Sequence, residues 1–357
     1  MILKELINKF DKSSIKAGEG LEKGQFPLYT CSPLVNKFLD DYICDGEAIV
    51  ISTGGNFAVH YVNGKFNYST DCYVFNTDKL DTKYLYYYLI SKTDDINKLF
   101  RGAGLKHLNK NEFLLMNVDN IDIQNQKRIV EHLDKISNLI ELRKKQVNKC
   151  DNLIKSQFVE MFKYEFNIKK IKELSSYLSR GKSPNYVENS EIKVINQACI
   201  YWNEFRFENV KYQDETKISR SLDKLIKYND VLITSTGTGT LGRCNVFRIS
   251  NDKYMADGHV SILRFITDQI NPLYFKYYFI QDKIQEKLYS DCVNGSTNQI
   301  ELSKDKFQNF DIIVPPIELQ NKFAKIVEQI DKQKFEFEMS LKKLEEMQAA
   351  LMQEYFG

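Results

Sequence analysis

Short loops that combine basic or amide side chains with glycine are the parts of this sequence best suited to chemistry. The segment Arg101-Gly-Ala-Gly-Leu-Lys-His107 joins Arg101, Lys106 and His107 through a glycine loop. Arginine, lysine, asparagine and glutamine offer hydrogen-bonding groups that suit base edges, and the two cations also bind phosphate. We therefore interpret this loop as a candidate DNA contact, with an ordinary polar turn as the alternative.

Other loops of the chain have the same character. Lysines flank Gly18 and Gly20, and a threonine-rich turn runs from Ser235 to Thr240. Lysine clusters of this kind can clamp phosphates, which would weaken binding as salt rises, or they can simply be solvated surface. The full set of candidate DNA-binding residues is Lys12, Lys16, Lys23, Thr53, Asn56, Arg101, Lys106, His107, Arg180, Lys182, Asn185, Tyr186, Thr236, Thr238, Arg243, Ser296, Thr297, Asn298 and Gln299.

Patterns for cofactor, metal or catalytic sites are weaker. The stretch from Gly237 to Gly242 matches the glycine spacing of a dinucleotide site, but residues 243–249 predict a strand where that site needs a helix. His107 has no histidine or cysteine partner at the spacing of metal ligands. The stretch Asn271-Pro-Leu-Tyr274 lacks the second proline of an adenine methyltransferase motif. We expect no cofactor, no metal and no catalytic residue.

Composition sets wide limits on the class of protein. A chain of 357 residues with 43% hydrophobic content predicts two or three domains, each with a core. The net charge of +2 means that DNA contacts must come from local basic patches. Seven cysteines without a CxxC pair argue against a disulfide framework or zinc ribbon. With Lys4 and Glu5 in the first residues and no long apolar stretch, we expect a cytoplasmic protein without a membrane partner.

The chain repeats itself, which is the strongest signal of its organisation. Residues 108–162 fall on 302–356 without a gap when the sequence is shifted by 194 positions. Matches at smaller shifts place 46–54 on 229–237 and 84–90 on 274–280. Because the matches keep the same order, we infer a tandem duplication with loops of unequal length.

Each half ends in a segment that predicts a long helix. Ten positions from 129 to 161, spaced alternately by four and three residues, are apolar at eight, and so are the ten positions 194 residues later. A 3.5-residue apolar repeat over more than four heptads is typical of a coiled coil. Each helix would be roughly 60 Å long for about 40 residues. Neither can bury its apolar seam alone, so we expect the two to pack against each other.

The regions before the helices predict small mixed domains. Short β-rich runs at 48–52 and 230–234 alternate with aromatic helical stretches, of which 84–90 is expected in the core instead of stacking on bases. The predicted fold class is mixed α+β, with two α/β domains in a tandem pseudo-repeat separated by two long helices. The expected boundaries are 1–120 for the first domain, 121–163 for the central helix, 164–314 for the second domain and 315–357 for the C-terminal helix.

This arrangement resembles the specificity subunits of Type I restriction-modification systems. The resemblance covers essentially the whole chain, and the order and spacing of its motifs carry it. The stretches concerned are 24–29, 125–130, 194–197, 235–237, 294–299, 315–327 and 351–356. One departure is Ile121-Asp122, which stands where the second half has Pro315-Pro316 before its helix.

The resemblance implies a DNA-reading subunit that has no catalytic activity of its own. Each domain would be a target-recognition domain for one part of a bipartite, asymmetric site in double-stranded DNA. The helices would pack antiparallel, hold the domains apart and dock two adenine methyltransferase subunits, and restriction subunits can join that complex.

Two other functions remain open from the residues themselves. A coiled-coil scaffold that binds only proteins would account for the helices, but not for two unlike, loop-rich domains in register with them. An enzyme, such as a nuclease or a methyltransferase, would need a signature that recurs in both halves, and no Asp/Glu-x-Lys nuclease pattern does so.

Overall fold

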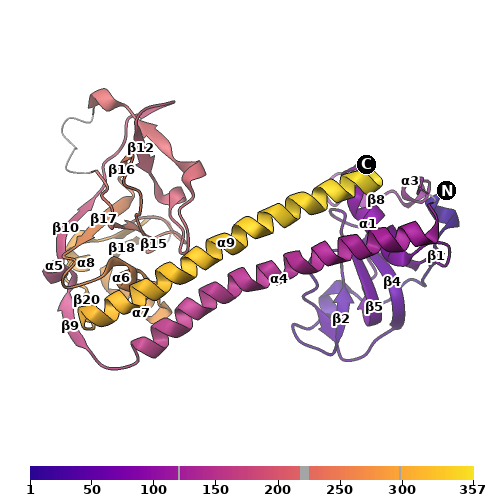
Figure 1. Ribbon diagram of the computed structural model, residues 1–357, viewed down its shortest axis with the longest axis horizontal. Coiled ribbons are helices and arrows are strands. Elements are labelled where there is room, and N and C mark those ends of the chain that lie inside the picture. The colour runs from indigo at the N-terminus through magenta and orange to yellow at the C-terminus, as the bar shows by residue number, and fades with distance from the viewer. Residues whose placement is uncertain (120, 218–224, 297–298) are drawn as a thin grey trace. The chain divides into compact units, whose positions relative to one another are not determined.

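The structure is a computed structural model that describes residues 1–119, 121–217, 225–296 and 299–357. It has the mixed α+β fold predicted from the sequence and contains two long helices, α4 (Ile123–Met161) and α9 (Ile317–Phe356) (Figure 1). The chain divides into two compact units. Unit 1 comprises Met1–Lys145 with Phe337–Gly357, and unit 2 comprises Gln146–Glu336. Each unit therefore holds one globular domain and a part of both long helices.

Unit 1 is built on a six-stranded sheet in the order β1-β6-β4-β5-β2-β3. Residues 48–51 of its central strand are wholly buried, as expected for an apolar run covered on both faces. Tyr84 and Leu85 are also fully buried, which confirms that the aromatic stretch 84–90 belongs to the core. The elements before α4 are η1 (Leu3–Glu5), β1 (Asn8–Lys9), η2 (Ala17–Glu19), β2 (Phe26–Tyr29), β3 (Phe38–Leu39), β4 (Cys44–Ser52), β5 (Val59–Tyr68), β6 (Cys72–Asn76), α1 (Thr82–Ser91), α2 (Thr93–Asn97), β7 (Phe100–Arg101), β8 (His107–Leu108) and α3 (Lys110–Leu114).

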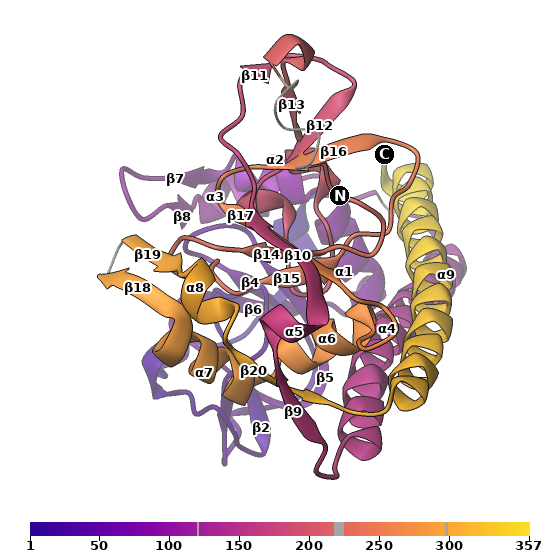
Figure 2. The same cartoon turned by 90° about the vertical axis from the view of Figure 1, so that its left-hand side faces the viewer.

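Unit 2 contains two four-stranded sheets, β10-β17-β14-β15 and β11-β13-β12-β16. The hairpin of β18 and β19 lies beside α7 and α8 (Figure 2). The elements are β9 (Asn167–Lys170), α5 (Ile171–Leu174), β10 (Ser175–Arg180), β11 (Tyr186–Val187), β12 (Ile192–Ile195), η3 (Gln197–Cys199), η4 (Phe207–Asn209), β13 (Lys211–Gln213), η5 (Glu215–Lys217), β14 (Val231–Thr234), β15 (Cys244–Val246), β16 (Lys253–Ala256), β17 (Val260–Phe265), α6 (Pro272–Phe279), α7 (Asp282–Cys292), β18 (Val293–Ser296), β19 (Gln299–Leu302), α8 (Lys304–Phe307) and β20 (Asp311–Val314).

The two units share one topology, which confirms the internal repeat. The order β1-β6-β4-β5 in unit 1 corresponds to β10-β17-β14-β15 in unit 2. In each case two helices, a short hairpin and a further short helix follow the sheet before the long helix begins. The two inner pairings, β4 with β6 and β14 with β17, are both antiparallel. The duplication therefore extends to the pairing of strands.

The apolar seams of the long helices lie where the 3.5-residue repeat predicts them. All ten seam positions of α4 and all ten of α9 are buried or half-buried. In unit 1, His132 bonds Tyr355 and Ser137 bonds Gln348. In unit 2, Asp151 pairs with Lys334 and Phe158 contacts Phe323. Numbers fall along one helix as they rise along the other, so the pair is antiparallel within each unit. In the part of the chain that the structure describes, no helix has both the length and the apolar content needed to cross a membrane.

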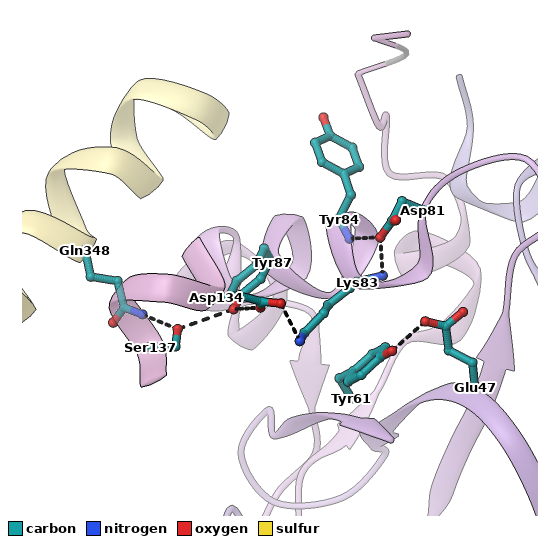
Figure 3. Close-up of polar contacts among 9 residues, drawn as sticks. All are labelled: Glu47, Tyr61, Asp81, Lys83, Tyr84, Tyr87, Asp134, Ser137 and Gln348. Atoms are coloured by element: carbon teal, nitrogen blue, oxygen red, sulfur yellow. Dashed lines mark hydrogen bonds and ion pairs between the residues drawn. The ribbon is translucent and has the colours of Figure 1, made fainter. Parts of the chain in front are cut away.

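In unit 1, α1 is fixed to α4 by a polar cluster beside the seam (Figure 3). Lys83 Nζ lies 2.7 Å from the Asp134 carboxylate, and the Tyr87 hydroxyl donates to the same carboxylate at 2.7 Å. Ser137, one turn further along α4, contacts both Tyr87 and the Gln348 amide of α9. The globular domain and both helices of unit 1 are thus joined by one connected set of side chains.

A buried glutamine stands at the start of each long helix. Gln126 Oε1 accepts the backbone N–H of Asp81, the N-cap of α1, and Gln320 Oε1 accepts that of Asn271, the N-cap of α6, both at 2.8 Å. Each amide nitrogen also donates to a carbonyl just before its helix, that of Ile121 or of Pro315. These side chains satisfy backbone groups that would otherwise be buried without partners.

Candidate nucleic-acid interface

Backbone hydrogen bonds bring four loops of unit 1 together at one edge of its sheet. The turn that follows β5 donates from Thr70 N to Ile15 O at 2.8 Å and accepts at Asp71 O from Thr53 N at 2.9 Å. The turn after β4 is in turn bonded to the β7–β8 hairpin, from Gly55 N to Lys106 O at 2.9 Å. We call residues 12–16, 53–56, 69–71 and 101–107 the loop edge of unit 1.

Unit 2 brings the corresponding four loops together, with two of the three bonds running in the same direction and the first with donor and acceptor exchanged. Lys182 N donates to Ala256 O at 3.1 Å, and Ser235 N donates to His259 O at 2.8 Å. The turn after β14 bonds the β18–β19 hairpin, from Gly237 N to Ile300 O at 3.3 Å. We call residues 180–183, 235–243, 257–259 and 299–301 the loop edge of unit 2. Since the same four loops meet in both units, the duplication includes the part of each domain that carries most candidate residues.

In unit 1 the hairpin β7–β8 presents three of the candidate side chains. Arg101, Lys106 and His107 are all exposed, and Arg101 lies 2.8 Å from the Glu112 carboxylate. Gly102 has a φ of 144°, and a Cβ there would lie 2.7 Å from the Leu105 carbonyl oxygen, so the hairpin needs glycine at this point. Gly102 therefore gives the tip of the glycine loop a defined shape.

The remaining candidates of unit 1 lie on neighbouring loops. Lys12 and Lys16 are exposed in the segment that reaches Ile15, and Asn56 is exposed in the turn after β4. The Thr53 hydroxyl donates to Asp71 O at 2.8 Å and so braces two loops against each other. Lys23 is exposed in a stretch whose Leu21 pairs with Phe38, and none of the bonds described above joins it to the loop edge.

In unit 2 the arginine candidates have protein partners. Arg180, at the end of β10, lies 2.6 Å from the Glu301 carboxylate and donates to Ser235 O at 3.3 Å. Arg243 donates to Gly239 O at 2.9 Å, and its guanidinium lies 4.7 Å from the centre of the Tyr201 ring. Both cations are thereby held in place on the loop edge.

Polar candidates of unit 2 fall into two places. Thr236 and Thr238 lie in the turn after β14, and exposed Lys182 and Gln299 lie on the adjoining loops. Asn185 and Tyr186 lead into β11 in the second sheet, where Asn185 N donates to Gln213 and Lys211 lies over the Tyr186 ring. Ser296 ends β18, while Thr297 and Asn298 lie outside the described residues.

The glycine-rich turn from Gly237 to Gly242 leads into strand β15, which pairs with β14. This confirms the prediction of a turn between two strands, since no helix begins there to receive a pyrophosphate. Among the described residues, no three His, Cys, Asp or Glu side chains form a group that could hold a metal ion.

Sequence reasoning missed two exposed side chains at the centre of the loop edges, Asp71 and His259. His259 Nδ1 lies 2.8 Å from Thr236 Oγ1, and the backbone N–H of His259 donates to Asp257 at 2.8 Å. Burial raises the pKa of Asp257, and the bond from His259 acts against that rise. The dipeptide Asp257-Gly258 is a turn signal that could have drawn attention to this loop.

Comparison with known proteins points to one family. The family described as Type I restriction modification DNA specificity domain matches residues 1–150 and 163–346. The S subunit of the Type I restriction-modification system from M. genitalium is a similar solved structure, with a TM-score of 0.70 and 15% identity over 100% of this chain and 95% of that one. A structure from a study of complex assembly and conformational transition of the type I R-M system has a TM-score of 0.54, also at 15% identity, over 100% of this chain and 96% of that one. These structures share the fold, and the family match extends over nearly the whole chain. The chain therefore belongs to the Type I restriction modification DNA specificity domain family.

Proposed function

We propose that this chain is the non-catalytic specificity subunit of a Type I restriction-modification enzyme and reads a bipartite, asymmetric target in double-stranded DNA. Each unit reads one part of the target through its loop edge. The long helices dock two adenine methyltransferase subunits, and restriction subunits can join the complex. The candidate residues of the loop edges are the proposed DNA contacts. The proposed boundaries are 1–120 and 164–314 for the two DNA-reading domains, and 121–163 and 315–357 for the two helices.

One observation carries this proposal. The two loop edges have matching backbone hydrogen bonds but unlike exposed side chains, with Arg101, Lys106 and His107 in one hairpin and Gln299 in the other. Phosphate contacts fix a protein on DNA, and base sequence is read by side-chain donors and acceptors. Two similar scaffolds with unlike side chains suit two half-sites of unlike sequence. A scaffold that bound only proteins would not need this pattern.

The direct test is selection from random duplex DNA at physiological salt, with the full chain co-expressed with its methyltransferase. We expect a split motif of two unlike parts at a fixed spacing. A continuous motif would contradict the model with two readers. A well-formed complex that enriches no sequence would contradict DNA reading and favour the scaffold.

Exchange of the first globular domain, residues 1–120, with that of a relative tests the assignment of half-sites. We expect one part of the motif to change and the other to stay the same, because the backbone bonds described for each loop edge join loops of the same unit. Simultaneous change of both parts would show that the two units do not read independently.

A paired deletion tests the role proposed for the helices. Removing residues 143–149 from α4 and 335–341 from α9 takes seven residues from each and keeps the 3.5-residue seam in register. Seven residues correspond to about 10 Å of helix. The spacer should therefore shorten by about three base pairs at 3.4 Å per step, while both half-sites stay unchanged. Deletion from α4 alone is the control, since it should misalign the seam and prevent assembly.

A further inference from the structure

We infer that Asp71 and His259 are specificity-determining residues that occupy the same position in the two loop edges, an inference that rests on the proposed function. Both lie in the turn before the strand that pairs with the centre of the main sheet, β6 in unit 1 and β17 in unit 2. Both side chains are exposed. Asp71 carries a carboxylate and His259 an imidazole, so the two side chains differ in chemistry although the backbone hydrogen bonds at the position are the same.

Two pairs of backbone bonds establish that the positions match. Asp71 O accepts from Thr53 N at 2.9 Å, and His259 O accepts from Ser235 N at 2.8 Å. Two residues earlier, Ser69 N donates to Tyr29 O at 2.9 Å, and Asp257 N donates to Ile195 O at 3.0 Å. The acceptors Tyr29 and Ile195 lie at the ends of β2 and β12. These two strands correspond, because β2 pairs in parallel with β5 and β12 pairs in parallel with β16.

The main chain at each position is held firmly while the side chain stays exposed. Asp71 O also accepts from the Thr53 hydroxyl at 2.8 Å and from Cys31 Sγ at 3.1 Å. His259 is fixed through its backbone N–H to Asp257 and through its ring Nδ1 to Thr236. A side chain on a fixed backbone can discriminate between bases, because its position does not adjust to a wrong partner.

The chemistry of the two side chains predicts what each can read. An ionised carboxylate only accepts hydrogen bonds and is repelled by phosphate. In the major groove, the base donors are the amino groups of cytosine N4 and adenine N6. Asp71 is therefore assigned to an amino-bearing base in the half-site of unit 1. His259 has Nδ1 engaged with Thr236, so Nε2 is the nitrogen available to a base in the half-site of unit 2.

Substitution of Asp71 in the full complex tests the first assignment. Asp71→Ala and Asp71→Asn should each lower discrimination at one base pair of the unit 1 half-site by about 10- to 100-fold, the usual value of one good base contact. The unit 2 half-site should not change. Asp45→Ala is the matched control, because Asp45 is an exposed carboxylate at the opposite end of the β4–β5 pair.

A base analogue identifies the group that Asp71 contacts. In a duplex whose base at the affected position lacks its exocyclic amino group, wild-type binding should fall by about the same factor as Asp71→Ala binding to the natural duplex. The variant should bind both duplexes equally. An unchanged wild-type affinity for the analogue would overturn the assignment of an amino-bearing base.

His259 is tested with two amides that mimic different ring nitrogens. His259→Gln extends a group to the place of Nε2 and should keep part of the preference in the unit 2 half-site. His259→Asn replaces Nδ1 alone and should lose that preference by about 10-fold or more. Unchanged thermal unfolding of both variants shows that the turn is intact.

The outcomes separate the inference from the proposed function. If wild type selects a split motif and Asp71→Ala and His259→Asn select the same motif, the inference fails and the proposed function stands. If the wild-type complex selects no motif, the proposed function fails and the inference falls with it.

Discussion

The start of the long helix is held by the same hydrogen bonds in unit 1 and unit 2, whereas the loop edges of the two units differ in their side chains. Gln126 and Gln320 make the same two kinds of backbone bond and are both fully buried. At the matching exposed position, by contrast, unit 1 has Asp71 and unit 2 has His259. At these positions, the two halves of the duplicated chain share the side chains that bond buried backbone groups and differ in the side chains exposed at the loop edges.

The equivalent strands β4 and β14 show that the interior of the two units also differs. The sequence match places Glu47 on Asp230. Glu47 is exposed on β4 and accepts the Tyr61 hydroxyl at 2.5 Å (Figure 3). Asp230 is fully buried and accepts two bonds of 2.7 Å from the Arg264 guanidinium. The strand pairing, however, aligns Ile49 with Val231 and so places Asp230 level with the buried Ala48. Unit 2 therefore has an internal ion pair where unit 1 has an apolar core residue, and the neighbouring Glu47 makes only a surface contact.

Arg264→Met should give the largest effect, because it leaves the Asp230 carboxylate buried without its partner. Loss of one member of a buried pair costs about 3–5 kcal/mol. Glu47→Gln is the comparison in unit 1, at an exposed polar contact on the equivalent strand, and should cost under about 1 kcal/mol. Urea unfolding of the full chain measures both. Similar losses for the two variants would show that burial does not separate these positions.

Gln126→Leu and Gln320→Leu should each lower the free energy of unfolding by about 2–4 kcal/mol, because each leaves one buried backbone N–H and one buried carbonyl without a hydrogen-bond partner. The two values should agree within about 1 kcal/mol if the helix starts are energetically equivalent. Gln333→Leu, at an exposed position of α9, is the control. A loss confined to one unit would break the equivalence.

Lysines of the unit 1 loop edge should give the smallest effect, on DNA binding and not on folding. Lys12→Ala, Lys16→Ala and Lys106→Ala should each lower affinity a few-fold for all sequences and reduce the slope of log affinity against log salt by about 1. Lys65→Ala, at the far end of the β4–β5 pair, should leave the slope unchanged. A loss restricted to one DNA sequence would instead make that lysine a base reader.

The fold was predictable from the sequence because periodicity and repetition are local signals. The 3.5-residue spacing located both seams, and the apolar run in 48–52 located the central strand. The composition of the loop edges was only partly predictable. Thr53 and Arg101 could be singled out by residue type, but Asp71 and His259 reach the edge through turns whose neighbours come from distant strands. For the same reason, no local pattern indicated that the stretch containing Lys23 is held to β3 through Leu21 or that Tyr186 enters the second sheet.

The discontinuity of unit 1 has a consequence for biosynthesis. Phe356 is buried against Tyr84 and Tyr88, and its carbonyl accepts a bond from Lys92, so the core of unit 1 includes the last turn of α9. Unit 2 is one uninterrupted stretch that ends at Glu336. On the ribosome, unit 2 can therefore complete its contacts while unit 1 still lacks its final side chains. The domain synthesised first would then be the last to mature, and until that moment it would expose an apolar surface to chaperones.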